Sequence, residues 1–140
     1  MKTIKASLVT LLALTLLFSL CACFGTEYDV WKDAMYTEDT ALGSGATTVT
    51  VEVTAVKKTV TFTLKTDEST LGAALLAEEL ITGEEGPYGL YVKTVNGILA
   101  DYDEDQTYWA LYIDGSYAMS GVDTTEIEAG KTYRLAKEKG

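Results

Sequence analysis

The sequence predicts an α+β domain, in which one helix packs on one face of a mixed, mostly antiparallel sheet. Apolar β-branched residues alternate with polar ones over residues 47–54 and again over 59–65, the pattern of strands buried on one face. Residues 71–81 are instead rich in Ala and Leu, which indicates a helix of about three turns. Because a single helix can cover only one face of a sheet, the strands must leave the other face exposed.

The two alternating segments form the predicted first hairpin. Only the four residues 55–58 join them, which is short enough for a hairpin connection. The apolar positions share one face of the sheet: Val49, Val51, Val53, Val60, Phe62 and Leu64.

The predicted helix follows this hairpin. Thr66–Thr70 supplies several N-cap residues before it, and Gly83 is a natural residue for its C-terminal end. Residues 84–87 then form a polar loop. Further strands are expected over residues 91–95, 109–113 and 132–135, with turns at Asn96-Gly97, Asp114-Gly115 and Ala129–Lys131.

Residues 1–22 have the three parts of a secretory signal. Lys2 and Lys5 give a positive start, residues 6–20 carry no charge, and the small Ala22 precedes Cys23. An uncharged run of about 18 or more residues can also span a bilayer, so a retained transmembrane helix is the alternative. The extreme N-terminal position and the small residue before Cys23 favour a cleaved signal peptide.

Leu20-Cys21-Ala22-Cys23 resembles the lipobox of bacterial lipoproteins, with Cys23 as the lipidated residue. Cys21 fits less well, because Leu20 would then directly precede the cleavage site. Each buried methylene contributes about 0.8 kcal/mol, so two or three acyl chains on Cys23 would anchor the protein firmly to the membrane. The alternative is a secreted protein with a disulfide. Cys21 and Cys23 are the only cysteines, however, and cleavage between them leaves the mature chain without a pair.

The sequence therefore predicts three parts of the chain: a signal peptide over 1–22, a tether over 23–29, and one domain over 30–137 with its core at about 47–135. Val30–Leu42 contains several aromatic and apolar residues, which a free tether would lack. We therefore expect this segment to pack on the domain. The sequence leaves open whether it adds a strand to the sheet.

The chain is strongly acidic, with 21 acidic and 11 basic residues and a net charge of −10. Cleavage would remove Lys2 and Lys5 and leave 9 basic residues against 21 acidic ones, a net charge of −12. This charge repels phosphate backbones and therefore argues against a nucleic-acid partner. The same negative charge would repel an anionic membrane surface and oppose a domain that lies flat on it. We therefore expect the lipid on Cys23 to be the contact with the membrane.

Several short motifs follow one another in the order of a known family. They are Ser69-Thr70-Leu71, Asn96-Gly97-Ile98, Tyr108–Gly115, Gly121-Val122-Asp123 and Glu128–Tyr133. This succession resembles the transcobalamin-like C-terminal domain of the soluble-ligand-binding β-grasp class, which occurs in many lipoproteins of Gram-positive bacteria. The resemblance spans about residues 47–135, and its most specific part is the Tyr-Trp strand with the Asx-Gly turn after it.

The resemblance implies a β-grasp fold and the binding of a small ligand. In the vitamin carriers of that family, the domain covers one face of a cobalamin that a helical domain also holds. This chain has no such helical domain. The specific ligand that the resemblance to the vitamin carriers implies is a corrinoid. No resident cofactor is expected.

Residues for catalysis are scarce in this sequence. The chain has no histidine, the usual general base near neutral pH. Cys23 is assigned to the lipid, and no serine has a partner base of the usual kind. A carboxylate-dependent hydrolase is formally possible because acidic residues abound, but no acidic pair stands out. The sequence therefore predicts that the protein is not an enzyme.

Residues 101–106 partly match a calcium-binding loop, since carboxylates occupy the first, third and fifth positions of this segment. The sixth position is Gln106 where an EF-hand needs glycine, and the twelfth is Tyr112 where it needs glutamate. We therefore interpret the segment as a solvated acidic loop and expect no metal site.

Tyrosines are the candidate ligand-binding residues, and they crowd into the second half of the chain. On the strand 108–113, Trp109, Leu111 and Ile113 form the predicted core face, which leaves Tyr108 and Tyr112 on the other face. Tyrosines suit flat or amphipathic partners, although β-sheets also favour them for packing alone. The candidate set is Tyr88, Tyr91, Tyr102, Tyr108, Tyr112 and Tyr117.

The sequence thus predicts an extracytoplasmic, membrane-anchored lipoprotein with a non-enzymatic domain that binds a small molecule. The alternative is a module that binds a cell-surface protein or glycan, or serves as a spacer on the envelope.

Overall fold

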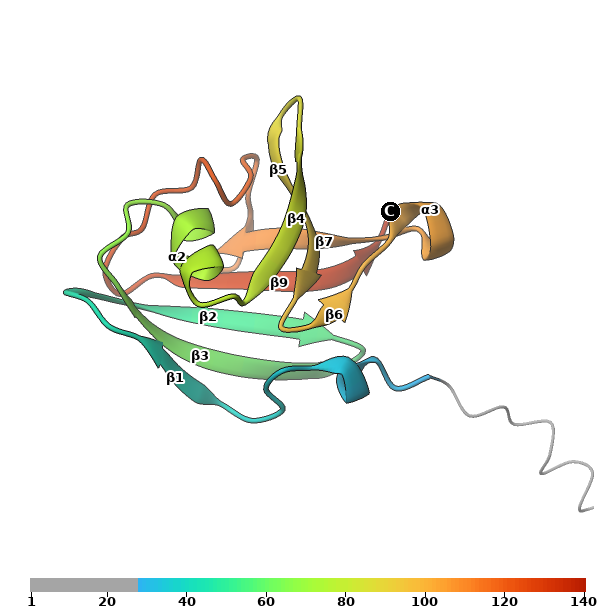
Figure 1. Ribbon diagram of the computed structural model, residues 1–140, viewed down its shortest axis with the longest axis horizontal. Helices are drawn as coiled ribbons and strands as arrows, with labels where there is room; N and C mark the ends of the chain where they lie inside the picture. The colour runs from blue at the N-terminus through green and yellow to red at the C-terminus, as the bar shows by residue number, and fades with distance from the viewer. Residues whose placement is uncertain (1–27) are drawn as a thin grey trace, which may run out of the picture.

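The computed structural model describes residues 28–140 (Figure 1). The predicted signal peptide, Cys23 and nearly all of the tether lie outside the described residues. Among residues 28–140, no helix is long and apolar enough to cross a membrane.

Two sheets make up most of the domain. The larger has the order β1-β3-β2-β9-β7-β8, and the smaller has the order β4-β5-β6. The strands are β1 (Thr40–Gly43), β2 (Thr47–Ala55), β3 (Lys58–Thr66), β4 (Ile81–Gly86), β5 (Gly89–Val95), β6 (Ile98–Leu99), β7 (Thr107–Ile113), β8 (Ser116–Tyr117) and β9 (Thr132–Lys139). The helical segments are the 3₁₀ helix η1 (Val30–Asp33), α2 (Leu71–Ala77) and α3 (Tyr102–Asp105).

The predicted first hairpin is confirmed as β2 and β3. Val51 lies opposite Phe62 in an antiparallel register, and these side chains belong to the buried core. On its other edge, β2 pairs in parallel with β9, and β9 pairs antiparallel with β7. The last strand of the chain therefore lies in the middle of the larger sheet and joins two hairpins that are distant in sequence.

The helix is shorter than the sequence predicted. It begins as expected, with the Thr70 hydroxyl accepting a hydrogen bond from the Ala73 amide at 3.2 Å. It ends at Ala77, because Glu79 takes a positive φ of 55° and Ile81 already pairs with Val95 in the smaller sheet. The apolar residues after Ala77 are therefore core residues of a turn and a strand.

Residues 84–86, expected as a loop, continue β4 instead. Their backbone pairs with β5, whereas their side chains are exposed. A strand exposed on both faces shows no alternation, which is why its polar sequence indicated a loop. Gly83 lies at a register shift of this pairing, and a Cβ there would lie 2.3 Å from the Tyr91 carbonyl oxygen. This glycine permits a close strand contact and does not end a helix.

The predicted α+β class is confirmed, but the arrangement is richer in sheet than expected. Helix α2 and the smaller sheet lie on the same side of the larger sheet (Figure 1). Leu71 and Leu75 of α2 belong to the same buried core as the valines of β2. The smaller sheet therefore shares with α2 the covering role that the sequence assigned to the helix alone.

The segment before β2 packs on the domain, as predicted. Trp31 is only 7% exposed, and its indole Nε1 donates to the Ala55 carbonyl at 2.9 Å. Tyr36 packs edge-on against Phe62, with ring centroids 5.5 Å apart. Further along, β1 pairs in parallel with β3, so the segment does add an edge strand to the sheet.

Asn96 does more than form the predicted turn. It is fully buried, and its side-chain amide exchanges two hydrogen bonds with the Tyr36 backbone, at 2.9 Å and 2.8 Å. This pairing fastens the N-terminal segment to the β5–β6 turn.

Candidate functional site

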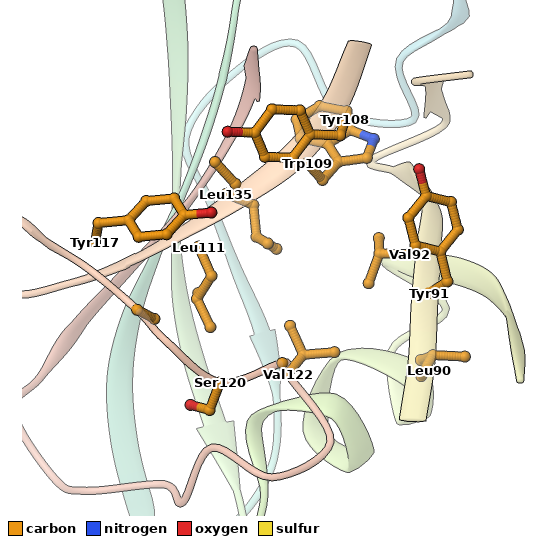
Figure 2. Close-up of a pocket in the computed structure, with 13 residues that line it drawn as sticks. Leu90, Tyr91, Val92, Tyr108, Trp109, Leu111, Tyr117, Ser120, Val122 and Leu135 are labelled. Atoms are coloured by element: carbon orange, nitrogen blue, oxygen red, sulfur yellow. The ribbon is translucent and has the colours of Figure 1, made fainter. Parts of the chain in front are cut away.

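A groove lies between the outer edges of β5 and β7 (Figure 2). Leu90, Tyr91 and Val92 form the β5 wall, and residues 108–111 form the β7 wall. Val122 and Leu135 lie between the walls, and the end toward β8 is closed by Tyr117, Ala118, Ser120 and Gly121. The groove therefore combines apolar side chains with the backbone edges of two strands.

The groove exists because two short strands cover only part of their neighbours. β6 pairs with Thr94 and Val95 of β5, and β8 pairs with Tyr112 and Ile113 of β7. The remaining outer edges have no partner strand in the described part of the chain. The Leu90 amide faces this space, since it donates to the Asp123 Oδ2 atom at 3.1 Å.

The cavity within the groove is about 160 Å³. Pockets that enclose a drug-sized ligand usually measure about 300–1,000 Å³. This cavity therefore admits a small apolar group, and a larger ligand would have to extend over the rim.

Three of the predicted tyrosines meet at this groove. Tyr91 comes from β5, Tyr108 from β7 and Tyr117 from β8, and all three line it. Tyr112 lies beside them, packed edge-on against Tyr117 at a centroid distance of 5.6 Å. The sequence prediction thus selected four residues that the fold brings together from three strands.

The other two predicted tyrosines lie apart from the groove lining. Tyr88 is at the tip of the β4–β5 hairpin and is 97% exposed. Tyr102 lies on α3, close to the C-terminal Gly140. Its distance from the groove could not be inferred from the sequence, because spacing along the chain does not show which loops meet.

Hydrogen bonds raise the pKa of two tyrosines at this site. The hydrogen bond with Tyr117 is the main cause for Tyr108, whose pKa lies above its ordinary value. The Tyr112 hydroxyl donates to the Glu138 carboxylate at 2.6 Å, and this bond is the main cause of its raised pKa. The Arg134 guanidinium lies 4.4 Å from the centroid of the Tyr112 ring, on its face. Tyr112 is thus fixed in place by charged neighbours.

The predicted alternation of β7 is confirmed on the core side. Trp109 and Leu111 are buried, and Ile113 packs against the core. The Trp109 indole Nε1 donates to the Lys93 carbonyl at 3.2 Å, so it also links β7 to β5. This link holds the two walls of the groove at a fixed separation.

The sequence reasoning found Tyr91 but missed Leu90 and Val92 of the β5 wall, and it missed the loop 118–123. Asp123 Oδ2 binds the Leu90 amide, and a Cβ on Gly89 would lie 2.3 Å from this oxygen. The other carboxylate oxygen, Oδ1, is buried without a hydrogen-bond partner among the described residues. Only the family resemblance included Gly121-Val122-Asp123, because a lone acidic residue in a loop does not by itself indicate a functional site.

The acidic segment 101–106 contains the short helix α3 where a loop was expected. Asp101 caps the helix by accepting from the Asp103 amide at 3.0 Å. The Thr107 hydroxyl donates to the Asp105 carboxylate, and this side-chain hydrogen bond is the main cause that lowers the pKa of Asp105. These carboxylates serve local structure, and the described residues contain no group of three ligand-type side chains that could hold a metal ion.

The comparisons with known proteins concern the fold and the family of the chain. Residues 68–135 match the family model of a domain of unknown function, DUF4430. A solved structure of a candidate metal-binding protein from Ruminococcus gnavus ATCC 29149 is 31% identical, with a TM-score of 0.64, and the match covers 68% of this chain and 99% of that one. The chain belongs to the family of this Ruminococcus protein.

That solved chain contains almost nothing beyond the matched region. Haptocorrin in complex with Cbi has a TM-score of 0.55 at 21% identity, over 66% of this chain and 25% of haptocorrin. At this identity the likeness shows a shared fold. No curated protein sequence matches the chain significantly.

Glu138→Gln should lower the pKa of Tyr112 toward its ordinary value of 10.0, because the amide is a weaker acceptor for the phenol hydrogen. The raised pKa means that the folded state favours the neutral phenol. Its contribution to stability is thus present below pH 10.0 and is lost as the pH rises through the raised pKa. A spectrophotometric tyrosinate titration, with Tyr112→Phe to identify the signal, measures the shift. An unchanged tyrosinate curve in Glu138→Gln would contradict the assignment.

Proposed function

We propose that this protein is a membrane-anchored lipoprotein whose domain binds a small ligand at the groove between β5 and β7. The observation that carries the proposal is the convergence of Tyr91, Tyr108 and Tyr117 around an apolar cavity at two unpaired strand edges. Tyrosine rings bury a large area and keep a polar hydroxyl available, so they suit a flat, amphipathic ligand.

A corrinoid is the specific ligand that we propose. The likeness to haptocorrin, whose structure contains Cbi, supports this choice, as does the resemblance of the sequence motifs to transcobalamin-like domains. A macrocycle is far too large for a cavity of about 160 Å³. It would therefore lie across the tyrosines and insert only a peripheral group between the walls.

The arrangement also supports the β-grasp class within the α+β fold. A mixed sheet has a parallel pair, β2 and β9, at its centre, and α2 packs across one face. In a β-grasp arrangement of this kind, the ligand groove lies at the side of the larger sheet where the outer edge of β7 has no partner strand beyond β8 among the described residues.

We further propose that the domain performs no catalysis. The chain has no histidine, and the polar side chains that line the groove are hydroxyls of tyrosine and of Ser120. No carboxylate or thiol lines the groove among the described residues. General acid–base chemistry near neutral pH therefore has no suitable group at this site.

Tyr108→Ala and Tyr117→Ala should each weaken cobalamin binding, because each removes one aromatic surface from the rim. We expect a loss of about tenfold per ring, equivalent to about 1.4 kcal/mol. Equilibrium dialysis measures the dissociation constants. Tyr102→Ala is the matched control, since Tyr102 lies outside the groove lining, and it should bind like the wild type. No retention of cobalamin by the wild-type protein at high micromolar concentration would exclude the corrinoid.

A protein-binding module is the second candidate function, and the unpaired edges of β5 and β7 favour it. An extended peptide can add a strand to such an edge and place alternate side chains in the groove. A peptide ligand would protect the β7 amides that face away from β9 from hydrogen exchange, whereas a flat ligand on the tyrosines would leave these outward amides unprotected.

Cys23→Ser should release the protein from the membrane or leave it unprocessed, because the thiol that accepts the lipid is absent. Cys21→Ser is the control and should remain membrane-bound. Fractionation of membranes and medium, followed by detection of the domain, measures the distribution. Unchanged membrane retention of Cys23→Ser would rule out the lipid anchor.

A further inference from the structure

Three hairpin turns in this domain place both central residues at positive φ. Asn96-Gly97 and Asp114-Gly115 have the residues that such turns prefer, with φ values of 53° and 79°, and of 48° and 84°. The third turn, between β2 and β3, has Val56 at 46° and Lys57 at 64°. A β-branched residue at positive φ is strained, so Val56 lowers the stability of the fold.

Packing does not compensate for this strain, because the Val56 side chain is 65% exposed. The turn also exposes Lys57 and Lys58, and Lys32 is exposed on η1, which lies beside this turn (Figure 1). Lys58 Nζ lies 4.8 Å from the centroid of the Trp31 ring, and Trp31 is hydrogen-bonded to the carbonyl of Ala55.

We call this surface the lysine end and define it as Lys32, Val56, Lys57 and Lys58. None of its three lysines forms an ion pair with a described residue. Two carboxylates share this end, since Asp29 caps η1 by accepting from the Trp31 amide and Asp33 of η1 accepts from the Tyr28 hydroxyl. Three lysines against these two carboxylates still make this end less acidic than the chain as a whole, whose net charge is −10.

The lysine end lies where the described chain begins. Tyr28 directly precedes the cap of η1, and Cys23 stands five residues before Tyr28. Five residues of fully extended chain span at most about 18 Å. η1 lies beside the β2–β3 turn, whereas the tip of the β4–β5 hairpin projects from the other side of the domain (Figure 1).

We propose that the lysine end rests on the surface of an anionic bilayer, with Val56 inserted at the headgroup level and the lysines paired with lipid phosphates. The proposal rests on the lipid anchor at Cys23. Lysines near an anionic surface are attracted to it, and an adjacent apolar side chain adds burial in the interface. The anchor supplies the proximity that the acidic domain would not achieve from solution. This contact turns the groove and the β4–β5 hairpin away from the membrane.

The test uses residues 23–140, whose only cysteine is Cys23. Coupling this thiol to a maleimide lipid in nanodiscs reproduces the anchor without any cellular acylation. Spin-labelled headgroups then broaden the amide signals of residues close to the bilayer. With anionic phosphatidylglycerol present, the amide signals of residues 55–58 should be lost, and those of Gly86, Tyr88 and Gly89 at the opposite hairpin should be retained.

The decisive variant is Val56→Asn with Lys57→Gly, which gives this turn its preferred residues. It should raise the melting temperature and also abolish the selective loss of signals at residues 55–58. The matched control, Asp114→Val with Gly115→Lys, puts the Val-Lys pair into the β7–β8 turn. It should lower the melting temperature and leave the signal loss at residues 55–58 unchanged.

The proposal is overturned if residues 55–58 are broadened no more than residues 86–89, or if the Asn-Gly variant keeps the selective loss. Equal broadening on purely zwitterionic nanodiscs would overturn it as well, because the lysines would then have no part in the contact. Since the coupling is chemical, these outcomes are independent of cellular lipidation, which the release of Cys23→Ser tests separately.

Discussion

The parallel pairing of β2 with β9 is the interaction on which the rest of the structure depends. It places Val51 beside Tyr133 and Val53 beside Leu135, all of them buried. The Tyr133 hydroxyl also donates to the Glu126 carbonyl at 2.9 Å, which secures the loop before β9. Because β9 in turn pairs with β7, this one contact connects the N-terminal hairpin to the strand that forms one wall of the groove.

The groove is a consequence of how far each strand pairs. β6 and β8 are two residues long each, so β5 and β7 keep uncovered edges that face a shared apolar space. Trp109 spans this space through its hydrogen bond to Lys93, and Asp123 fastens the loop beside it to Leu90. The tyrosines are thus held by a rigid frame, as the proposed binding of a flat ligand at this groove requires.

The sequence predicted the elements whose side chains alternate or whose turns need special residues. The β2–β3 hairpin, the buried face of β7 and the Asn96-Gly97 turn follow from local patterns. The end of α2 and the exposed part of β4 could not be predicted. Leu80 is buried and continues the Ala- and Leu-rich pattern of the helix, and Glu84 is exposed in a polar stretch that is typical of a loop. The tyrosines, Tyr91 among them, were predicted by residue type, but Leu90 and Val92 were not, since β5 becomes part of the site only through contacts between sheets.

The most direct test of the groove as the binding site is a titration of ¹⁵N-labelled domain with a corrinoid, followed through its amide chemical shifts. The account predicts that the largest changes occur at residues 90–92, 108–111, 117, 118 and 120–122, which line the groove. The signals of α3 should stay in place. Changes concentrated at α3 or at the β1 edge, with the groove signals unmoved, would contradict the account.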